Sequence, residues 1–159
     1  FGKGSKIVEI RPEINNKLKE ALKSKDQVAL STIRLIMAAL KDRDITARAS
    51  GKAEGIDDSE ILSMLQSMMK QRNESIKTYE DAGRKDLADR ERAEIVVIET
   101  FMPKQLSEDE IAAAVQSKIT ETGAGSVRDM GKVMAALKAE YAGQFDMGRA
   151  SALVKSALS

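Results

Sequence analysis

The sequence predicts an all-α protein, in which an N-terminal subdomain of long helices precedes a small three-helix C-terminal subdomain. Three observations support this class. Apolar residues recur at three- and four-residue intervals almost throughout the chain. Only two prolines occur among 159 residues, and helix-start and helix-stop residues flank the periodic segments. A content of 42% hydrophobic and 32% charged residues is typical of a folded, helix-rich globular protein.

The N-terminal end is expected to lie outside the fold. Residues 1–11 lack an initiator methionine and the apolar run of a signal peptide, so we interpret them as a leader or an appended segment. Pro12 suits the first position of a helix, which should run to about Ser24. Its predicted apolar stripe has four-residue spacing and consists of Ile14, Leu18 and Leu22.

Two longer helices are predicted next. Asp26 should cap the first, which ends near Arg48, and its apolar stripe is Ile33, Ile36, Met37 and Leu40. A polar loop over residues 51–55 follows. Asp57 and Glu60 form a capping-box pattern at the start of the second. That helix carries a one-sided apolar stripe of Ile61, Leu65, Met68, Met69, Ile76 and Tyr79.

A fourth helix is predicted from Lys85 to Phe101, after a stop at Gly83. The run of residues 96–98 is also typical of a strand, but helix-forming residues on both sides favour a helix. Pro103 ends it. We therefore expect an N-terminal subdomain over residues 12–103 and a C-terminal subdomain over residues 104–159.

Three shorter helices should make up the C-terminal subdomain. Ser107 and Glu110 form a second capping box, and Gly123 is placed to end the helix that follows. Residues 126–129 should open the next helix, and Asp146 should cap the last.

Charge and composition exclude several functions. The chain has no histidine and no cysteine, which removes imidazole bases, thiolate nucleophiles and the common zinc ligands, so neither a cofactor nor a metal is expected. The net charge of +1 conceals 12 basic and 6 acidic residues in positions 1–52, against 7 and 12 in positions 53–100 and 7 and 7 in positions 101–159. The protein is therefore a charge dipole with a basic N-terminal end.

Few patterns indicate catalysis. Ser67 and Lys70 match the S-x-x-K pattern of acyl-transferring enzymes, but the companion Ser-Asp-Asn and Lys-Thr-Gly elements are missing. Two acidic groups, residues 57–60 and 108–110, lie at helix starts, where capping explains them. Methionines at helical spacing favour core packing, and the alternative is an adaptable protein-binding surface on the helix of residues 58–82.

Basic side chains of the C-terminal subdomain are the main binding candidates. Gly131 and Gly148 adjoin two of them and could let a phosphate or a neighbouring helix approach the backbone. An ordinary solvated surface explains each charge singly. The alternative is a shallow surface for the backbone of structured RNA, formed by Arg128, Lys132, Lys138, Arg149 and Lys155.

Four segments resemble the YqeY family in the order in which they occur, namely residues 41–44, 95–110, 127–134 and 143–151. The resemblance covers the chain from about Pro12 to its end. YqeY proteins are small, all-helical and similar to the tail of the GatB subunit of the aspartyl/glutamyl-tRNA amidotransferase. In that enzyme glutamine hydrolysis and amide transfer belong to other parts of the complex, and the tail engages tRNA.

The resemblance therefore implies a non-catalytic accessory protein that binds tRNA or assists tRNA-dependent amidation, whose partners would be tRNA and a protein of tRNA aminoacylation or amidation. A family label of carbon–nitrogen ligase with glutamine as amide donor would be inherited. The alternative function is a helical protein–protein interaction adaptor. We expect a cytoplasmic protein without a membrane segment, because no apolar run approaches the ~18 residues of a transmembrane helix.

Overall fold

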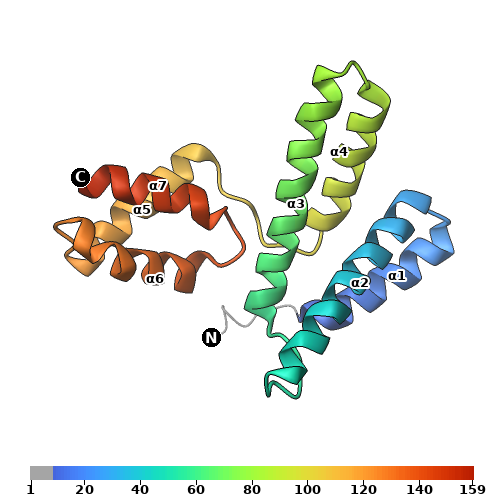
Figure 1. The fold of residues 1–159 in the computed structure, drawn as a ribbon, viewed down its shortest axis with the longest axis horizontal. Coiled ribbons are helices and arrows are strands. Elements are labelled where there is room, and N and C mark those ends of the chain that lie inside the picture. The colour runs from blue at the N-terminus through green and yellow to red at the C-terminus, as the bar shows by residue number, and fades with distance from the viewer. Residues whose placement is uncertain (1–8) are drawn as a thin grey trace. The chain divides into compact units, whose positions relative to one another are not determined.

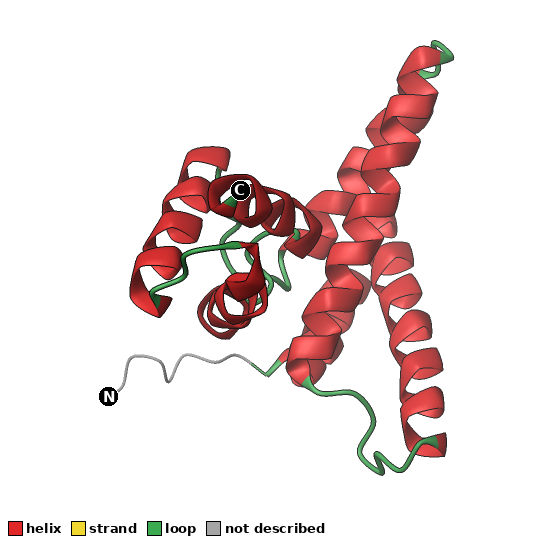
Figure 2. Cartoon of the chain, turned by 60° about the vertical axis from the view of Figure 1, so that its left-hand side comes forward, coloured by secondary structure: helices red, strands yellow, loops and turns green. Residues whose placement is uncertain are grey.

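The computed structural model describes residues 9–159 and confirms the all-α class (Figures 1 and 2). This part of the chain contains seven α-helices and one 3-10 turn, and no strand occurs in it. The elements are α1 (Ile10–Ser24), α2 (Gln27–Ala49), α3 (Asp58–Asp81), α4 (Lys85–Glu99), α5 (Glu108–Thr122), the turn η2 (Val127–Asp129), α6 (Met130–Tyr141) and α7 (Met147–Leu158).

The described residues divide into two compact units, unit 1 up to Phe101 and unit 2 from Met102 to Ser159. Unit 1 consists of two helical hairpins, α1 with α2 and α3 with α4, and α2 also packs against α3 and α4. The α1–α2 turn uses Lys25 in a left-handed conformation with φ 59°. Apolar side chains that are fully buried form the core of unit 1, and they are Ile33, Ile36, Ile61, Met64, Leu65 and Ile98.

The first helix ends at Ser24 as predicted, but it starts before Pro12 and its apolar stripe differs near its end. The segment predicted as a leader lies outside the described residues for positions 1–8, but Ile10 and Arg11 belong to α1. Ile10 is buried and extends the apolar stripe by one turn, which is why the helix starts before Pro12. At the other end Leu22 is 51% exposed, and Ala21 is buried in its place.

Most of the predicted caps are present. The Asp26 carboxylate accepts a 3.0 Å hydrogen bond from the Ala29 N–H. Both predicted capping boxes are confirmed, the first at the start of α3 and the second at the start of α5. Asp146 does stand before α7, but its side chain makes no capping hydrogen bond. Val127–Asp129 form a 3-10 turn that Ser126 caps, so α6 starts only at Met130.

A partly buried ion pair joins the start of α1 to the second half of α2. Arg11 donates from Nη1 and Nη2 to the two oxygens of Asp44, both at 2.8 Å, and also from Nη2 to the Ile56 carbonyl at 2.8 Å. Asp44 in turn accepts the Ile56 N–H at 2.9 Å. Asp44 is only 5% exposed. The pair therefore fixes the α2–α3 loop against α1.

Gly55 is required by this arrangement. Its φ is +84°, and a Cβ atom there would lie 2.2 Å from Oδ1 of Asp44. Gly51, in the same loop, has a φ of +102°, but no atom beyond its chain neighbours lies within 4 Å of the position that a Cβ would take. Alanine substitutions at the two positions therefore differ in one respect: both strain the backbone, but only the one at Gly55 also causes a side-chain collision.

Gly55→Ala should lower the free energy of unfolding by about 2–4 kcal/mol, because it combines positive-φ strain with displacement of a buried carboxylate. Gly51→Ala is the matched control and should cost only about 1 kcal/mol, from strain alone. Urea unfolding followed by circular dichroism measures both. Equal losses for the two variants would contradict the role given to Gly55.

Unit 2 is a three-helix bundle of α5, α6 and α7. Val133 and Leu137 of α6 are fully buried, as are Ala150 and Val154 of α7. Phe145, in the loop before α7, covers the same core. At the start of the unit, the Leu106 N–H donates to the Gln144 carbonyl at 2.9 Å, which ties the segment before α5 to the α6–α7 loop.

Candidate functional site

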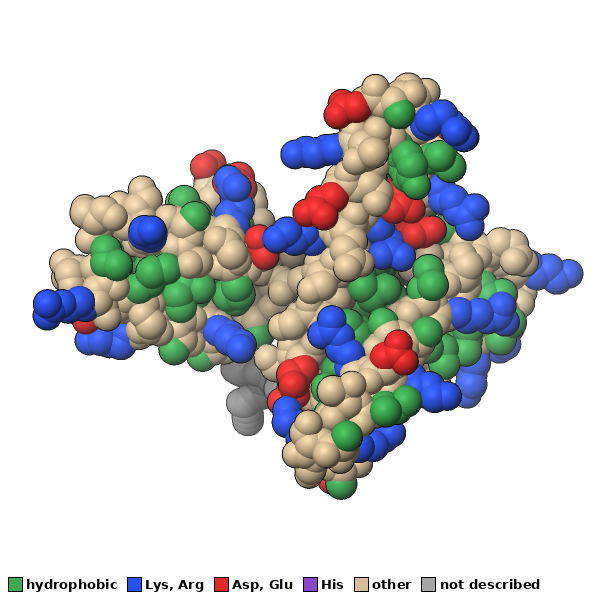
Figure 3. All heavy atoms as spheres, in the orientation of Figure 1, with side chains coloured by type: hydrophobic (Ala, Val, Ile, Leu, Met, Phe, Trp, Pro, Cys, Tyr) green, Lys and Arg blue, Asp and Glu red, His purple; other side chains and the backbone are tan. Residues whose placement is uncertain are grey.

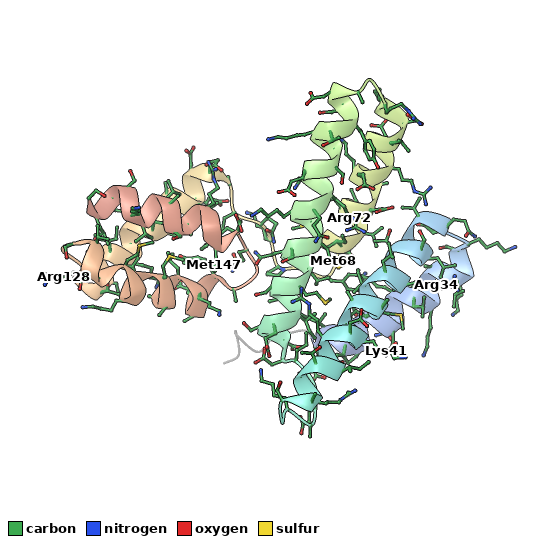
Figure 4. All side chains as sticks on the ribbon, in the orientation of Figure 1. Arg34, Lys41, Met68, Arg72, Arg128 and Met147 are labelled. Atoms are coloured by element: carbon green, nitrogen blue, oxygen red, sulfur yellow. The ribbon has the colours of Figure 1, made fainter. Side chains whose placement is uncertain are left out.

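The five predicted RNA-contacting cations all lie in unit 2, and all five are exposed. Arg128 is in the 3-10 turn before α6 (Figure 4). Lys132 is in the first turn of α6 and Lys138 in its last turn. Arg149 is in the first turn of α7, and Lys155 in its last turn. Each of these short helices packs one face against the core, and the cations lie on its exposed face.

These residues do not form one cluster. Helices α6 and α7 run in opposite directions (Figure 1). The start of α6 and the end of α7 therefore share one end of the bundle, with Arg128, Lys132 and Lys155. The other end holds Lys138 and Arg149. Within α6, the six-residue separation of the two lysines corresponds to ~9 Å along the axis and ~120° around it.

Two of the five cations are already paired. The Arg149 guanidinium contacts the Glu108 carboxylate at the start of α5, and this pairing raises the pKa of Arg149. Lys132 lies 3.7 Å from an oxygen of Asp129. The Gly125 N–H also donates to Asp129, and this hydrogen bond is the main reason why the pKa of the carboxyl is lowered. A phosphate would compete with a carboxylate at both positions.

The side chains of the other three cations form no ion pair and no hydrogen bond with any residue from 9 to 159. They are Arg128, Lys138 and Lys155. The unit as a whole has balanced charge, with 7 basic and 7 acidic residues in positions 101–159. Most acidic groups of the unit already cap a helix or pair with another cation. Because Arg128, Lys138 and Lys155 have no such partner within the described residues, they are available to an external anion.

The two predicted glycines have few neighbours within the protein. No atom outside the local backbone lies within 4 Å of the position that a Cβ would take at Gly131, so the helix-packing alternative does not apply there. At Gly148 the nearest atom is an oxygen of Asp146 at 3.4 Å, an ordinary contact. Approach of a phosphate to either backbone stays a prediction.

Sequence reasoning missed a buried lysine in this unit. Lys118 is 5% exposed and joins α5 to α6, because its ammonium donates to Glu140 and, at 3.2 Å, to Glu121. The hydrogen bond from Lys118 is the main cause of the lowered pKa of Glu140. Position 118 continues the buried stripe of Ile111, Ala114 and Val115, which was the available sequence signal.

The candidate catalytic patterns do not converge on a pocket. Ser67 and Lys70 are both exposed on α3. Among residues 9–159 there is no group of three or more acidic side chains arranged to hold a metal ion. Over the same range, every helix is too short or too polar to cross a lipid bilayer.

The described residues define a small all-α protein of two helical units, and comparison with known proteins supplies the family. The family model described as Yqey-like protein matches residues 11–158, so the chain belongs to this family. This confirms the resemblance found in the sequence.

Three named relatives of this chain come from fungi. A protein of Pyrenophora tritici-repentis is 31% identical over 136 residues, covering 81% of this chain and 71% of the relative. One from Lachancea thermotolerans is 27% identical and covers 76% and 64%. One from Candida glabrata is 31% identical and covers 65% and 54%. All three are called altered inheritance of mitochondria protein 41, mitochondrial.

The names of these relatives bear on where the protein is located, and the coverage of their sequences limits what they say about function. The expectation of a cytoplasmic protein is wrong, because the relatives are named mitochondrial proteins. The chain spans 64% of the Lachancea protein and 54% of the Candida protein. Functions of those whole proteins are therefore proposals for this chain.

Proposed function

We propose that this protein is a non-catalytic accessory protein that binds tRNA or another structured RNA through phosphate contacts of unit 2. One observation carries the proposal. Arg128, Lys138 and Lys155 are exposed and unpaired within the described residues, whereas Lys118, Lys132 and Arg149 of the same unit are paired with carboxylates. Unpaired cations on a rigid helical unit are suited to RNA backbone, which is recognised by shape and phosphate contacts.

The resemblance to the amidotransferase tail gives the proposal its substrate class. A tail that engages tRNA needs no reaction centre of its own, and this chain contains no histidine and no cysteine. The accessory role would then be to hold tRNA for a partner protein of aminoacylation or amidation.

Charge reversal tests this surface. Lys138→Glu and Lys155→Glu should each weaken tRNA binding several-fold and reduce the slope of log K against log[salt] by about 1, because each removes one phosphate contact. Arg149→Glu should have a smaller effect, since Glu108 already neutralises that guanidinium. Fluorescence anisotropy with labelled tRNA at several salt concentrations measures all three.

Lys77→Glu is the matched control, because Lys77 is exposed on α3 in unit 1 and changes the net charge equally. Loss of binding in Lys77→Glu as large as in Lys138→Glu would show a general charge effect and contradict a surface on unit 2. Absence of wild-type binding at low salt would contradict the proposal as a whole.

The adaptor alternative needs a different surface from the one first suggested. Met64 is 1% exposed and its neighbours Met68 and Met69 are half-buried, so the methionines of α3 mainly fill the core. The exposed apolar residues of α2, Leu35 at 48% and Ile45 at 54%, favour this function more. A stoichiometric protein partner that copurifies after nuclease treatment, and is lost in Leu35→Glu, would support it.

A further inference from the structure

A pocket of about 300 Å³ lies in unit 1 between the beginning of α1 and the second half of α2. Its volume is at the lower end of the range of small-molecule sites. Ile14 and Leu40, both buried, contribute apolar surface, as does the half-buried Met37. The charged residues that line the pocket are Arg11, Lys41, Asp44 and Arg48.

The single carboxylate of this pocket is already occupied. Asp44 accepts two hydrogen bonds from Arg11 and one from the Ile56 N–H. These bonds, led by those from Arg11, lower the pKa of Asp44 to about 2. Asp44 is therefore an anion at neutral pH whose hydrogen bonds come from Arg11 and Ile56. Its charge also attracts Arg48, but within the described residues it forms no hydrogen bond or ion pair with Arg48 or Lys41.

Two of the cations keep free donors. Within residues 9–159 the Lys41 ammonium has no hydrogen bond and no ion pair. Over the same residues Arg48 donates only from Nε, to the Ala53 carbonyl at 3.3 Å, and the N–H groups of both Nη atoms have no acceptor there. With Arg11 and Asp44 cancelling, the lining residues carry a net charge of +2.

The positive charge extends beyond the pocket along α2. Arg34, Lys41 and Arg48 recur at seven-residue intervals and so lie on one side of the helix. Arg34 and Lys41 are labelled on this helix in Figure 4, and Figure 3 shows Lys and Arg side chains gathered over α1 and α2. Such a stripe would raise the local concentration of an anionic ligand.

We propose that the α1–α2 pocket binds a phosphate monoester, with Lys41 and Arg48 on the phosphate and the organic part against Ile14, Met37 and Leu40. A phosphate monoester carries about −1.5 to −2 charges at pH 7 and has three strong acceptor oxygens, which match the charge and the free donors of the pocket. A carboxylate carries only one negative charge and would neutralise half of the net charge of +2 on the lining residues. The apolar lining favours an ester over inorganic phosphate.

Phenyl phosphate is the probe, because it combines the phosphate with a small apolar group. Methionine methyl NMR of the full chain reports the site directly, since Met37 lines the pocket and Met147 lies in unit 2 (Figure 4). Millimolar phenyl phosphate should shift the Met37 signal and leave that of Met147 unchanged. Absence of a Met37 shift overturns the proposal, and inorganic phosphate binding equally well overturns the role of the apolar lining.

Variants of exposed residues identify the donors without unfolding the protein. Lys41→Gln and Arg48→Gln should each weaken binding about tenfold, the usual consequence of losing a charge-assisted hydrogen bond. Arg43→Gln is the matched control, because Arg43 is exposed on the same helix and does not line the pocket. Equal weakening in all three variants contradicts a specific site.

The phosphate could belong to a free nucleotide or to the 5′ end of an RNA. Each source is tested by comparing a phosphorylated ligand with its hydroxyl form. Uridine 5′-monophosphate and uridine test a free nucleotide, and a short RNA with and without a 5′-phosphate tests the end of an RNA. In either case the phosphorylated form should bind and the form with a free hydroxyl should not, and binding of the hydroxyl form overturns the proposal. The pocket is built from unit 1 alone, so its failure leaves the proposed RNA surface of unit 2 intact, and the reverse also holds.

Discussion

Asp44→Ala should lower the free energy of unfolding by about 3 kcal/mol. The substitution leaves the Arg11 guanidinium without its partner and the buried Ile56 N–H without its acceptor. Breaking a buried pair typically costs about 3–5 kcal/mol, and the lower figure applies because the Arg11 side chain is still 37% exposed to water. Urea unfolding followed by circular dichroism gives the value.

The same carboxylate should make stability depend on pH. Its pKa is about 2 in the folded protein, below the usual 3.8, so the unfolded chain binds a proton more readily than the folded chain. The stabilisation is therefore complete above about pH 5 and is lost as the pH falls through about 4 towards 2, by about 2 kcal/mol in all. Asp44→Asn should flatten the wild-type curve over this interval.

Asp42→Ala is the matched control, because Asp42 is exposed on the same helix and its side chain has no ion pair within residues 9–159. It should change stability by no more than about 0.5 kcal/mol. If Asp42→Ala and Asp44→Ala cost the same, the Arg11–Asp44 pair does not hold the α2–α3 loop.

The second large effect is expected at the pair that joins α3 to α4. Arg72 Nε lies 2.9 Å from Oε1 of Glu94, and the two side chains are only 12% and 10% exposed. Arg72 also donates to the Met68 carbonyl at 3.1 Å. Arg72→Met should destabilise by about 3 kcal/mol, because it leaves Glu94 buried beside only the more distant Arg90.

The double variant Arg72→Met, Glu94→Leu should recover most of this loss, since an apolar pair of similar size carries no unpaired charge. Arg90→Ala is the control and should cost less than about 1 kcal/mol, because that side chain is 67% exposed and lies 3.6 Å from Glu94. Thermal and urea unfolding of the three variants measure the coupling. A double variant less stable than Arg72→Met would contradict this account.

Helix positions could be predicted from sequence because their signals are local. Four-residue apolar spacing and caps such as Asp57 with Glu60 depend only on neighbours along the chain. The start of α1 was misplaced because Pro12 is a strong local signal, whereas Ile10 joins the helix through burial in a core assembled by other elements.

The ion pair of the α1–α2 pocket and the Arg149–Glu108 pair of the unit 2 surface could not be predicted, because each joins residues that are far apart in the sequence. Arg11 and Asp44 are 33 residues apart, and Arg149 and Glu108 are 41 apart. Spacing along one helix gives no information about such pairs. Three of the predicted cations of unit 2 are free of partners within the described residues. The other two are paired because α5 folds against α7, which brings Glu108 to Arg149, and because a turn brings Asp129 beside Lys132.

The most direct test of the proposed function is the salt dependence of tRNA binding by the intact wild-type protein. Three phosphate contacts from Arg128, Lys138 and Lys155 predict a slope of log K against log[salt] between about −2 and −3. Reversing two of these charges together, in Lys138→Glu with Lys155→Glu, should bring the slope to about −1. A wild-type slope near zero, or no binding at low salt, would contradict the account.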